Sequence, residues 1–112
     1  MNPTPANNAT VWRIYTESRP NLPRLLAMAG IDGATLIPAT GVFRGSQEDA
    51  TVIEIITPGD DIDAPSRIAA LAETIRETNA QQSVLLSRHT VSMVELVALP
   101  ATALLPDSQP VA

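Results

Sequence analysis

Alternating apolar and polar residues predict β-strands in three segments of the chain. Val11–Thr16 is rich in β-branched and aromatic residues, and Ala34–Arg44 and Thr51–Thr57 are two further apolar runs. The polar residues Gly-Ser-Gln-Glu-Asp between the last two runs predict a turn. A final strand is expected to begin within Gln82–Leu86 and to continue, bent near His89, to about Leu99.

Apolar residues at spacings of three and four predict two helices. Asn21 is expected to cap the first helix, with a proline in its first turn, and Gly30 to end it. Asp63 is expected to cap the second helix, which ends at Asn79. The apolar face of this second helix comprises Ile68, Leu71, Ala72 and Ile75.

The predicted order of elements is β-α-β-β-α-β, which defines an α+β fold. Two strand–helix–strand units in succession favour a ferredoxin-like arrangement. In that arrangement one antiparallel sheet of four strands carries both helices on one face, and the first and third strands are central. Residues 10–99 form this domain, with a flexible N-terminal arm over residues 1–9 and a flexible C-terminal tail over residues 100–112.

The alternation also predicts that the second face of the sheet is apolar. It places Val11, Tyr15, Leu36, Val42, Val52 and Ile56 there, with Arg13, Arg44 and Glu54 among them. Arg13 and Glu54 would pair across the two central strands. Because a patch of this size usually marks association, we expect copies of the chain to pack on this face, although the C-terminal segment could cover it instead. The predicted interface residues are Val11, Arg13, Tyr15, Val42, Glu54 and Ile56.

Composition and charge exclude several classes of protein. The formal net charge is −5, which argues against a nucleic-acid binder. The sequence contains no cysteine and no lysine, so thiolate and Schiff-base chemistry are absent. We predict no membrane span, because the apolar runs are too short. The first residues lack the pattern of a signal peptide, so we expect a cytoplasmic protein.

Few residues suggest chemistry. The glycines at 41 and 45 could cradle an anion with Arg44 as its anchor, but a strand bulge and a hairpin turn explain them better. Asp60, Asp61 and Asp63 could bind a hard cation, but helix capping is the better explanation. The candidate ligand-binding residues are Arg44, Gly45, Glu48 and His89. We predict no catalytic residue, no metal site and no cofactor.

One pattern of residues resembles a known family. Thr40, Gly41, Phe43, Gly45, Glu48 and Gln82 are similar to positions in small bacterial and phage-borne PII-like proteins, whose second strand reads T-G-x-aromatic-x-G-x-x-E. The resemblance covers about residues 11–96. It implies a ferredoxin-like subunit that forms trimers with the sheets turned inward and binds ligands in clefts between subunits. The long loop that follows the second strand in PII signalling proteins is replaced here by a short one, about Ser46–Ala50.

Three functions remain open at this point. The favoured hypothesis is a non-enzymatic bacterial or phage homo-oligomer, with a trimer favoured, that binds a small molecule at a subunit cleft or a protein partner. The second is a small enzyme with a site between subunits that uses His89, Arg44 and Glu54. The third is a structural or inhibitory protein that acts on another protein through its surface.

Overall fold

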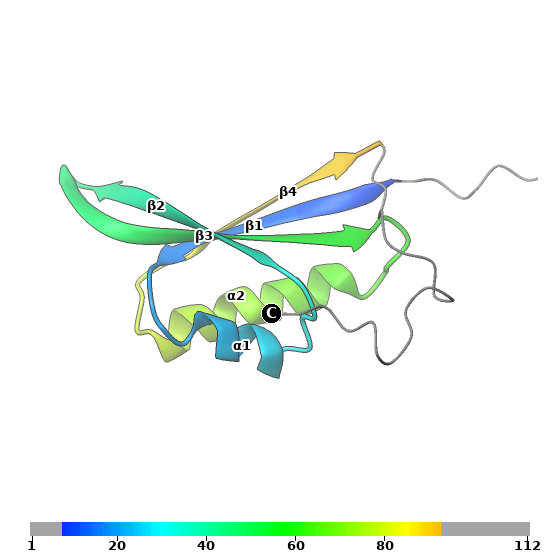
Figure 1. The fold of residues 1–112 in the computed structure, drawn as a ribbon, viewed down its shortest axis with the longest axis horizontal. Coiled ribbons are helices and arrows are strands. Elements are labelled where there is room, and N and C mark those ends of the chain that lie inside the picture. Colours follow the sequence, from blue (N-terminus) through cyan, green and yellow to red (C-terminus); the bar gives the residue numbers. More distant parts are fainter. Residues whose placement is uncertain (1–7, 93–112) are drawn as a thin grey trace, which may run out of the picture.

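The computed structural model describes residues 8–92 and contains four strands and two helices (Figure 1). Their order is the predicted β-α-β-β-α-β. The predicted tail and the end of the final strand near Leu99 lie outside the described residues, as does most of the predicted N-terminal arm. The elements are β1 (Ala9–Glu17), α1 (Leu22–Met28), β2 (Thr35–Phe43), β3 (Ser46–Pro58), α2 (Ala64–Thr78) and β4 (Leu85–Val91).

The four strands form one antiparallel sheet in the order β2-β3-β1-β4. Strands β1 and β3 are therefore central, and both helices lie on the same face of the sheet (Figure 1). This arrangement confirms the predicted ferredoxin-like fold. We call the sheet face beneath the helices the helix face, and the opposite one the open face.

The core lies between the sheet and the two helices. Trp12 and Ile14 of β1 and Ile53 of β3 are buried there because alternate residues of a strand point to the same side. The indole Nε1 of Trp12 donates a hydrogen bond of 2.9 Å to Oγ1 of Thr57, so the polar atom of this buried ring is satisfied. The helices contribute Leu22, Leu25, Leu26, Ala64, Ile68, Leu71, Ala72 and Ile75.

The helices occupy the predicted segments, but their predicted side-chain caps are wrong. Neither Asn21 nor Asp63 makes a side-chain capping hydrogen bond. Instead, Asn21 Nδ2 donates to Asn79 Oδ1 at 2.8 Å and so joins the start of α1 to the end of α2. Asp61 accepts the backbone N–H of Asp63 at 3.1 Å. Asn21 is thus used for a tertiary contact, and Asp63 contributes only its backbone N–H to the loop contact.

The predicted turn between β2 and β3 is correct in containing Gly45 and wrong in extending to Asp49. The turn is formed by Arg44 and Gly45, whose φ angles are 50° and 82°, and β3 begins at Ser46. Two consecutive residues with positive φ fit a tight two-residue hairpin, which matches the twist of its strands. The polar residues that follow are therefore paired in the strand, and the hairpin extends past the helices (Figure 1).

The register of this hairpin corrects the predicted faces of β2. Leu36 pairs with Ile53 and Val42 with Gln47, which places both on the side of the helix face. Val42 therefore does not share a face with Val11 and Tyr15, as the sequence had predicted. The open face receives Thr35, Ile37, Ala39, Gly41 and Phe43 from β2. A shift of one residue reverses every side chain of a strand, which is why the error affects the whole of β2.

Candidate functional site

The open face is rich in apolar side chains, and several are exposed. Phe43 is 56% exposed, Ile56 51% and Leu85 65%. Tyr15 and Ile37 are also exposed on this face, whereas Val11 is buried. In the middle of the face, Arg13 Nε donates to Glu54 Oε2 at 3.0 Å, which confirms the predicted pairing across the central strands. This apolar face contrasts with the solvated outer face of an ordinary sheet.

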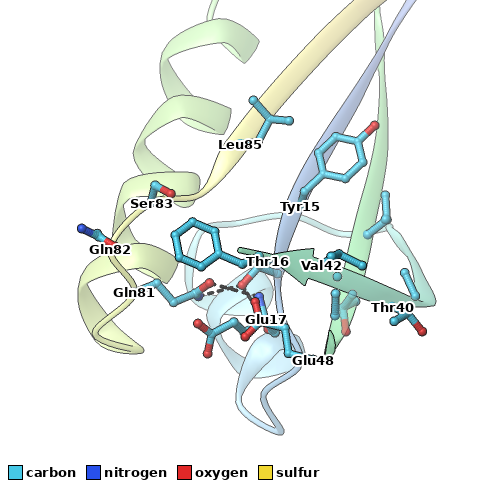
Figure 2. Close-up of a pocket in the computed structure, with 16 residues that line it drawn as sticks. Tyr15, Thr16, Glu17, Thr40, Val42, Glu48, Gln81, Gln82, Ser83 and Leu85 are labelled. Carbon is cyan, nitrogen blue, oxygen red and sulfur yellow. Dashed lines mark hydrogen bonds between the residues drawn. The ribbon is translucent and has the colours of Figure 1, made fainter. Parts of the chain in front are cut away.

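A cavity of about 550 Å³ lies at the end of the sheet beside the β2–β3 hairpin, and residues from both faces of the sheet line it. Its walls are the end of β1, the β2–β3 hairpin and the connection between α2 and β4 (Figure 2). Its volume falls within the range of small-molecule sites. The lining residues are Tyr15, Thr16, Glu17, Ala39, Thr40, Gly41, Val42, Phe43, Glu48, Ala50, Thr51, Val52, Gln81, Gln82, Ser83 and Leu85.

Hydrogen bonds tie the walls of the cavity together. Gln81 Oε1 accepts the backbone N–H of Glu17 at 3.0 Å, and Gln81 Nε2 donates to Thr16 Oγ1 at 2.7 Å (Figure 2). On the other side, the hydroxyls of Ser18 and Thr51 lie 2.6 Å apart. The end of β1 is thus bonded both to the connection before β4 and to the hairpin.

Gly41 leaves space in the hairpin wall. It pairs with Glu48, and a Cβ atom built on it would lie 3.5 Å from Cγ of Glu48 and 3.6 Å from Cβ of Ala50. These are ordinary contact distances, so a side chain could be accommodated in the strand. Because Gly41 lines the cavity, such a side chain would reduce its volume.

The charges of the cavity are acidic. Glu17 and Glu48 line it, and no arginine or histidine does so among residues 8–92. Glu17 forms an ion pair with Arg19, whereas no described residue pairs with Glu48. The guanidinium of Arg44 lies 5.1 Å from the centroid of the Phe43 ring, in reach of a cation–π contact. The cavity therefore offers two carboxylates, amide and hydroxyl groups, and two aromatic rings.

The predicted ligand-binding residues are not brought together. Glu48 lines the cavity, while Arg44 and Gly45 form the hairpin turn. His89 lies on the open face of β4 opposite Val11, outside the cavity lining.

Sequence reasoning missed most of the lining, because it comes from segments far apart in the chain. The motif that resembles PII-like proteins was the one part of the sequence that indicated the cavity lining. Five of its positions line the cavity: Thr40, Gly41, Phe43, Glu48 and Gln82.

Within a single chain, the residues of the enzyme hypothesis are also separated. Glu54 lies on the open face in the second half of β3, whereas Arg44 lies beyond the first residue of that strand. At about 3.3 Å per residue, this is roughly 25 Å along the strand. His89 is closer to Glu54, since both strands flank β1.

Metal sites and membrane-spanning helices are two further features to consider in residues 8–92. No group of three or more His, Asp or Glu side chains in this part of the chain is arranged to hold a metal ion. Neither of the helices within it has the length and hydropathy that crossing a membrane requires.

Comparisons with known proteins place the fold. No family model and no curated protein matches the chain. A phage SAM lyase in complex with S-methyl-5′-thioadenosine is similar in structure, with a TM-score of 0.62 and 18% identity over 88% of this chain and 92% of the lyase. CPII, a nitrogen regulatory PII-like protein from Thiomonas intermedia K12 bound to ADP, AMP and bicarbonate, has a TM-score of 0.56 and 16% identity over 80% of this chain and 97% of CPII.

A third similar structure is the GlnK–ATP complex of B. subtilis, with a TM-score of 0.52 and 15% identity over 80% of this chain and 86% of GlnK. At these identities the likeness concerns the fold. The resemblance read from the sequence is confirmed at that level: the chain has the ferredoxin-like fold of PII-like proteins.

Proposed function

We propose that this protein is a cytoplasmic homo-oligomer that binds a small adenosine-containing molecule in the cavity beside the β2–β3 hairpin. The observation that carries the proposal is the cavity itself, of about 550 Å³, with aromatic rings and amide and hydroxyl groups in its lining. Three proteins of similar fold, described above, were solved with S-methyl-5′-thioadenosine, with ADP and AMP, and with ATP.

The lining suits a nucleoside. The rings of Phe43 and Tyr15 offer faces on which a purine can stack. The amide of Gln82 provides both a donor and an acceptor, as do the hydroxyls of the lining serine and threonines, and these groups match the edges of a base and a ribose. Apolar walls with a few polar groups are typical of small-molecule sites.

The charges favour a ligand without phosphates. A di- or triphosphate is normally held by arginine, by lysine or by clustered backbone N–H groups. Here the described lining contains Glu17 and Glu48 and no cation. Arg19 offsets Glu17, which leaves the carboxylate of Glu48 to repel a phosphate and to attract a cation. We therefore expect neutral or cationic nucleosides to bind more tightly than ATP.

The open face is the proposed surface of association. Its exposed apolar side chains and the Arg13–Glu54 ion pair would be covered by further copies of the chain, with a trimer as the favoured number. The predicted interface residues Val11, Arg13, Tyr15, Glu54 and Ile56 all lie on this face. Tyr15, Phe43 and Leu85 of this face also line the cavity, so a neighbouring copy would help to enclose the ligand.

A second candidate function is an enzyme that acts on S-adenosylmethionine. The similarity to a phage SAM lyase over most of both chains motivates it. The observation that favours it is the acidic lining, because the sulfonium of S-adenosylmethionine is a cation that Glu48 would attract. The alternative of a protein partner without a small ligand has no comparable feature in its support.

Isothermal titration of the full chain with four compounds tests these functions. We expect S-methyl-5′-thioadenosine and S-adenosylmethionine to bind at least about tenfold more tightly than AMP or ATP. If ATP binds most tightly, the charge argument is wrong, and if none binds, the proposed ligand class is wrong. Mass spectrometry of S-adenosylmethionine incubated with the protein separates the two candidates, because only an enzyme would consume it.

A further inference from the structure

We propose that Gln81 is a positioning residue that sets the separation of two walls of the cavity. Its side-chain amide joins the connection between α2 and β4 to the end of β1. The consequence for ligand affinity rests on the proposed function, whereas the effect on the wall itself is measurable without a ligand.

Both ends of the Gln81 amide are used. The side chain is nearly enclosed, with the residue only 5% exposed. Its oxygen accepts the backbone N–H of Glu17 at 3.0 Å, and its nitrogen donates to the Thr16 hydroxyl at 2.7 Å (Figure 2). The same hydroxyl donates to the carbonyl of Glu17 at 3.1 Å. A buried amide with fixed partners on a strand acts as a rigid link, because breaking it would leave polar atoms without partners.

The backbone brings Gln81 to this position at a conformational cost. Ala80 has a φ of 54°, in the left-handed region that glycine usually occupies at a helix end. The N–H of Gln81 donates to the carbonyl of Arg76 at 2.9 Å, which closes the last turn of α2. A non-glycine residue persists in this conformation only where the surrounding contacts hold it. The two hydrogen bonds of the Gln81 side chain supply such contacts.

The side-chain link to β1 has no duplicate in the described structure, and the nearest backbone pairing of this connection with β1 is that of Leu85 with Tyr15. Among residues 8–92, no other side-chain hydrogen bond joins the segment 80–83 to β1. The opposite wall has its own link, in which Ser18 bonds to Thr51 through the side chains and to Asp49 through the backbone at 3.1 Å. Loss of the Gln81 amide would therefore leave the wall that carries Gln82 and Ser83 held only by the end of α2 and by the pairing of Leu85 with Tyr15, with the hairpin wall in place.

The side chain acts through its neighbours rather than on the ligand. Its donor and acceptor are already engaged with β1, whereas Gln82 and Ser83, which follow it in the lining, are exposed. We infer that Gln81 determines where these two side chains stand relative to Tyr15 on the other wall.

Two variants of the full chain and one matched control test the proposal. Gln81→Leu keeps the approximate size and removes both hydrogen bonds. Gln81→Glu still accepts the Glu17 N–H and can accept a hydrogen bond from the Thr16 hydroxyl, so it should rescue part of the effect. Asn21→Ala removes a different side-chain amide bond, to Asn79, which lies outside the cavity lining. It controls for a general loss of stability.

The first measurement is amide hydrogen exchange by NMR without a ligand. We expect the Glu17 N–H to exchange at least about tenfold faster in Gln81→Leu, with a smaller increase in Gln81→Glu and no selective increase in Asn21→Ala. The second is titration with S-methyl-5′-thioadenosine, where Gln81→Leu should lose about tenfold in affinity and Asn21→Ala should bind as the unchanged protein does.

Each result decides a separate claim. Unchanged exchange at Glu17 in Gln81→Leu overturns the link, whether or not the compound binds. Faster exchange with unchanged affinity shows that the link is structural only and overturns the positioning role. If the unchanged protein does not bind the compound, the proposed ligand is wrong, and exchange at Glu17 alone then decides whether Gln81 holds the wall. Should Gln81→Leu fail to fold, the graded effect expected of Gln81→Glu decides in its place.

Discussion

Both faces of the sheet are rich in apolar side chains, but only the helix face is covered by other parts of the described chain. On the helix face, Ile53 of β3 is fully buried beneath the helices, whereas three residues later Ile56 of the same strand is 51% exposed on the open face. Both positions carry the same side chain in the same strand. The comparison shows that an apolar strand pattern identifies surfaces that exclude water without identifying what covers them.

The polar groups of the two faces differ as well. On the helix face, the buried indole of Trp12 is bonded to Thr57. The open face holds the Arg13–Glu54 ion pair and Glu48 of the cavity lining, which has no described partner. A closed face of this kind serves stability, and the available groups of the open face are those that the proposed recognition would use.

The largest expected effect comes from truncating one isoleucine on each face. Ile53→Ala should reduce the free energy of unfolding by about 2–5 kcal/mol, because it leaves a cavity in a packed core. Ile56→Ala should cost about 1 kcal/mol or less in a dissociated chain, because its side chain is half exposed. Urea denaturation at low protein concentration measures both. Equal losses would show that the chain itself already closes the open face.

A charge on the open face should prevent association. Ile56→Arg places a cation within the proposed contact, where burial without a partner is costly. Ile62→Arg is the control, because Ile62 is 87% exposed in the connection before α2. Native mass spectrometry should show an oligomer for the unchanged protein and for Ile62→Arg, and mainly single chains for Ile56→Arg. An unchanged protein that stays a single chain at all concentrations contradicts the proposed assembly.

Filling the cavity should weaken binding without weakening the fold. Gly41→Val adds a side chain next to Glu48 where contact distances are ordinary, and valine suits a strand. We expect at least about a tenfold loss of affinity for S-methyl-5′-thioadenosine, which corresponds to about 1.4 kcal/mol, and an unchanged or higher unfolding temperature. Thr35→Val, on the same face of β2 but outside the lining, should change neither. Full affinity in Gly41→Val would place the ligand elsewhere.

The coupling energy of the Arg13–Glu54 ion pair depends on whether the open face is covered. Its side chains are 36% and 24% exposed, so in a dissociated chain their coupling should be about 0.5–1 kcal/mol. A double-mutant cycle with Arg13→Ala and Glu54→Ala measures this coupling by denaturation. In the assembled protein the coupling should be larger and less sensitive to salt, because a covering copy would exclude water. Identical coupling at low and high protein concentration would argue against a cover.

The smallest expected effect concerns the helix layer and pH. The hydrogen bond from Arg67 to Asp61 holds the pKa of the Asp61 carboxyl below its ordinary value. The charged form is therefore favoured in the folded chain, so the contribution is complete above the ordinary pKa of about 4 and is lost as pH falls through the lowered pKa. Asp61→Asn should flatten the acid limb of a stability–pH curve slightly and leave the neutral limb nearly parallel. A steeper acid limb would contradict this assignment.

The sequence was sufficient to predict the elements in which one side is buried and the other is exposed. In β1, buried Trp12 and Ile14 alternate with Arg13 and Tyr15, so the strand and its faces could be predicted correctly. The same holds for α2, where Ile68 and Ile75 recur on one side. These elements border the core, and burial imposes a period on the sequence.

The hairpin was predicted less well because it lies beyond the helices. Around the turn, residues of β2 and β3 are mostly exposed on both sides, so no burial pattern indicates their faces or the start of β3. The turn at Arg44 is formed by a residue that seldom adopts positive φ. Its identity therefore gave no signal for the turn, and alternation without a burial pattern assigned the faces of β2 in reverse.

By itself, the sequence determined the order of elements, the helix-covered core and the apolar character of a second sheet face. These features follow from local periodicity, because burial of one side of an element fixes the spacing of apolar residues that are close in the sequence. Only the tertiary structure decided which residues form the cavity. Tyr15, Glu48 and Gln82 come from three distant segments, and their meeting depends on strand register and on the path of the chain after α2. Such long-range contacts leave no period in the sequence.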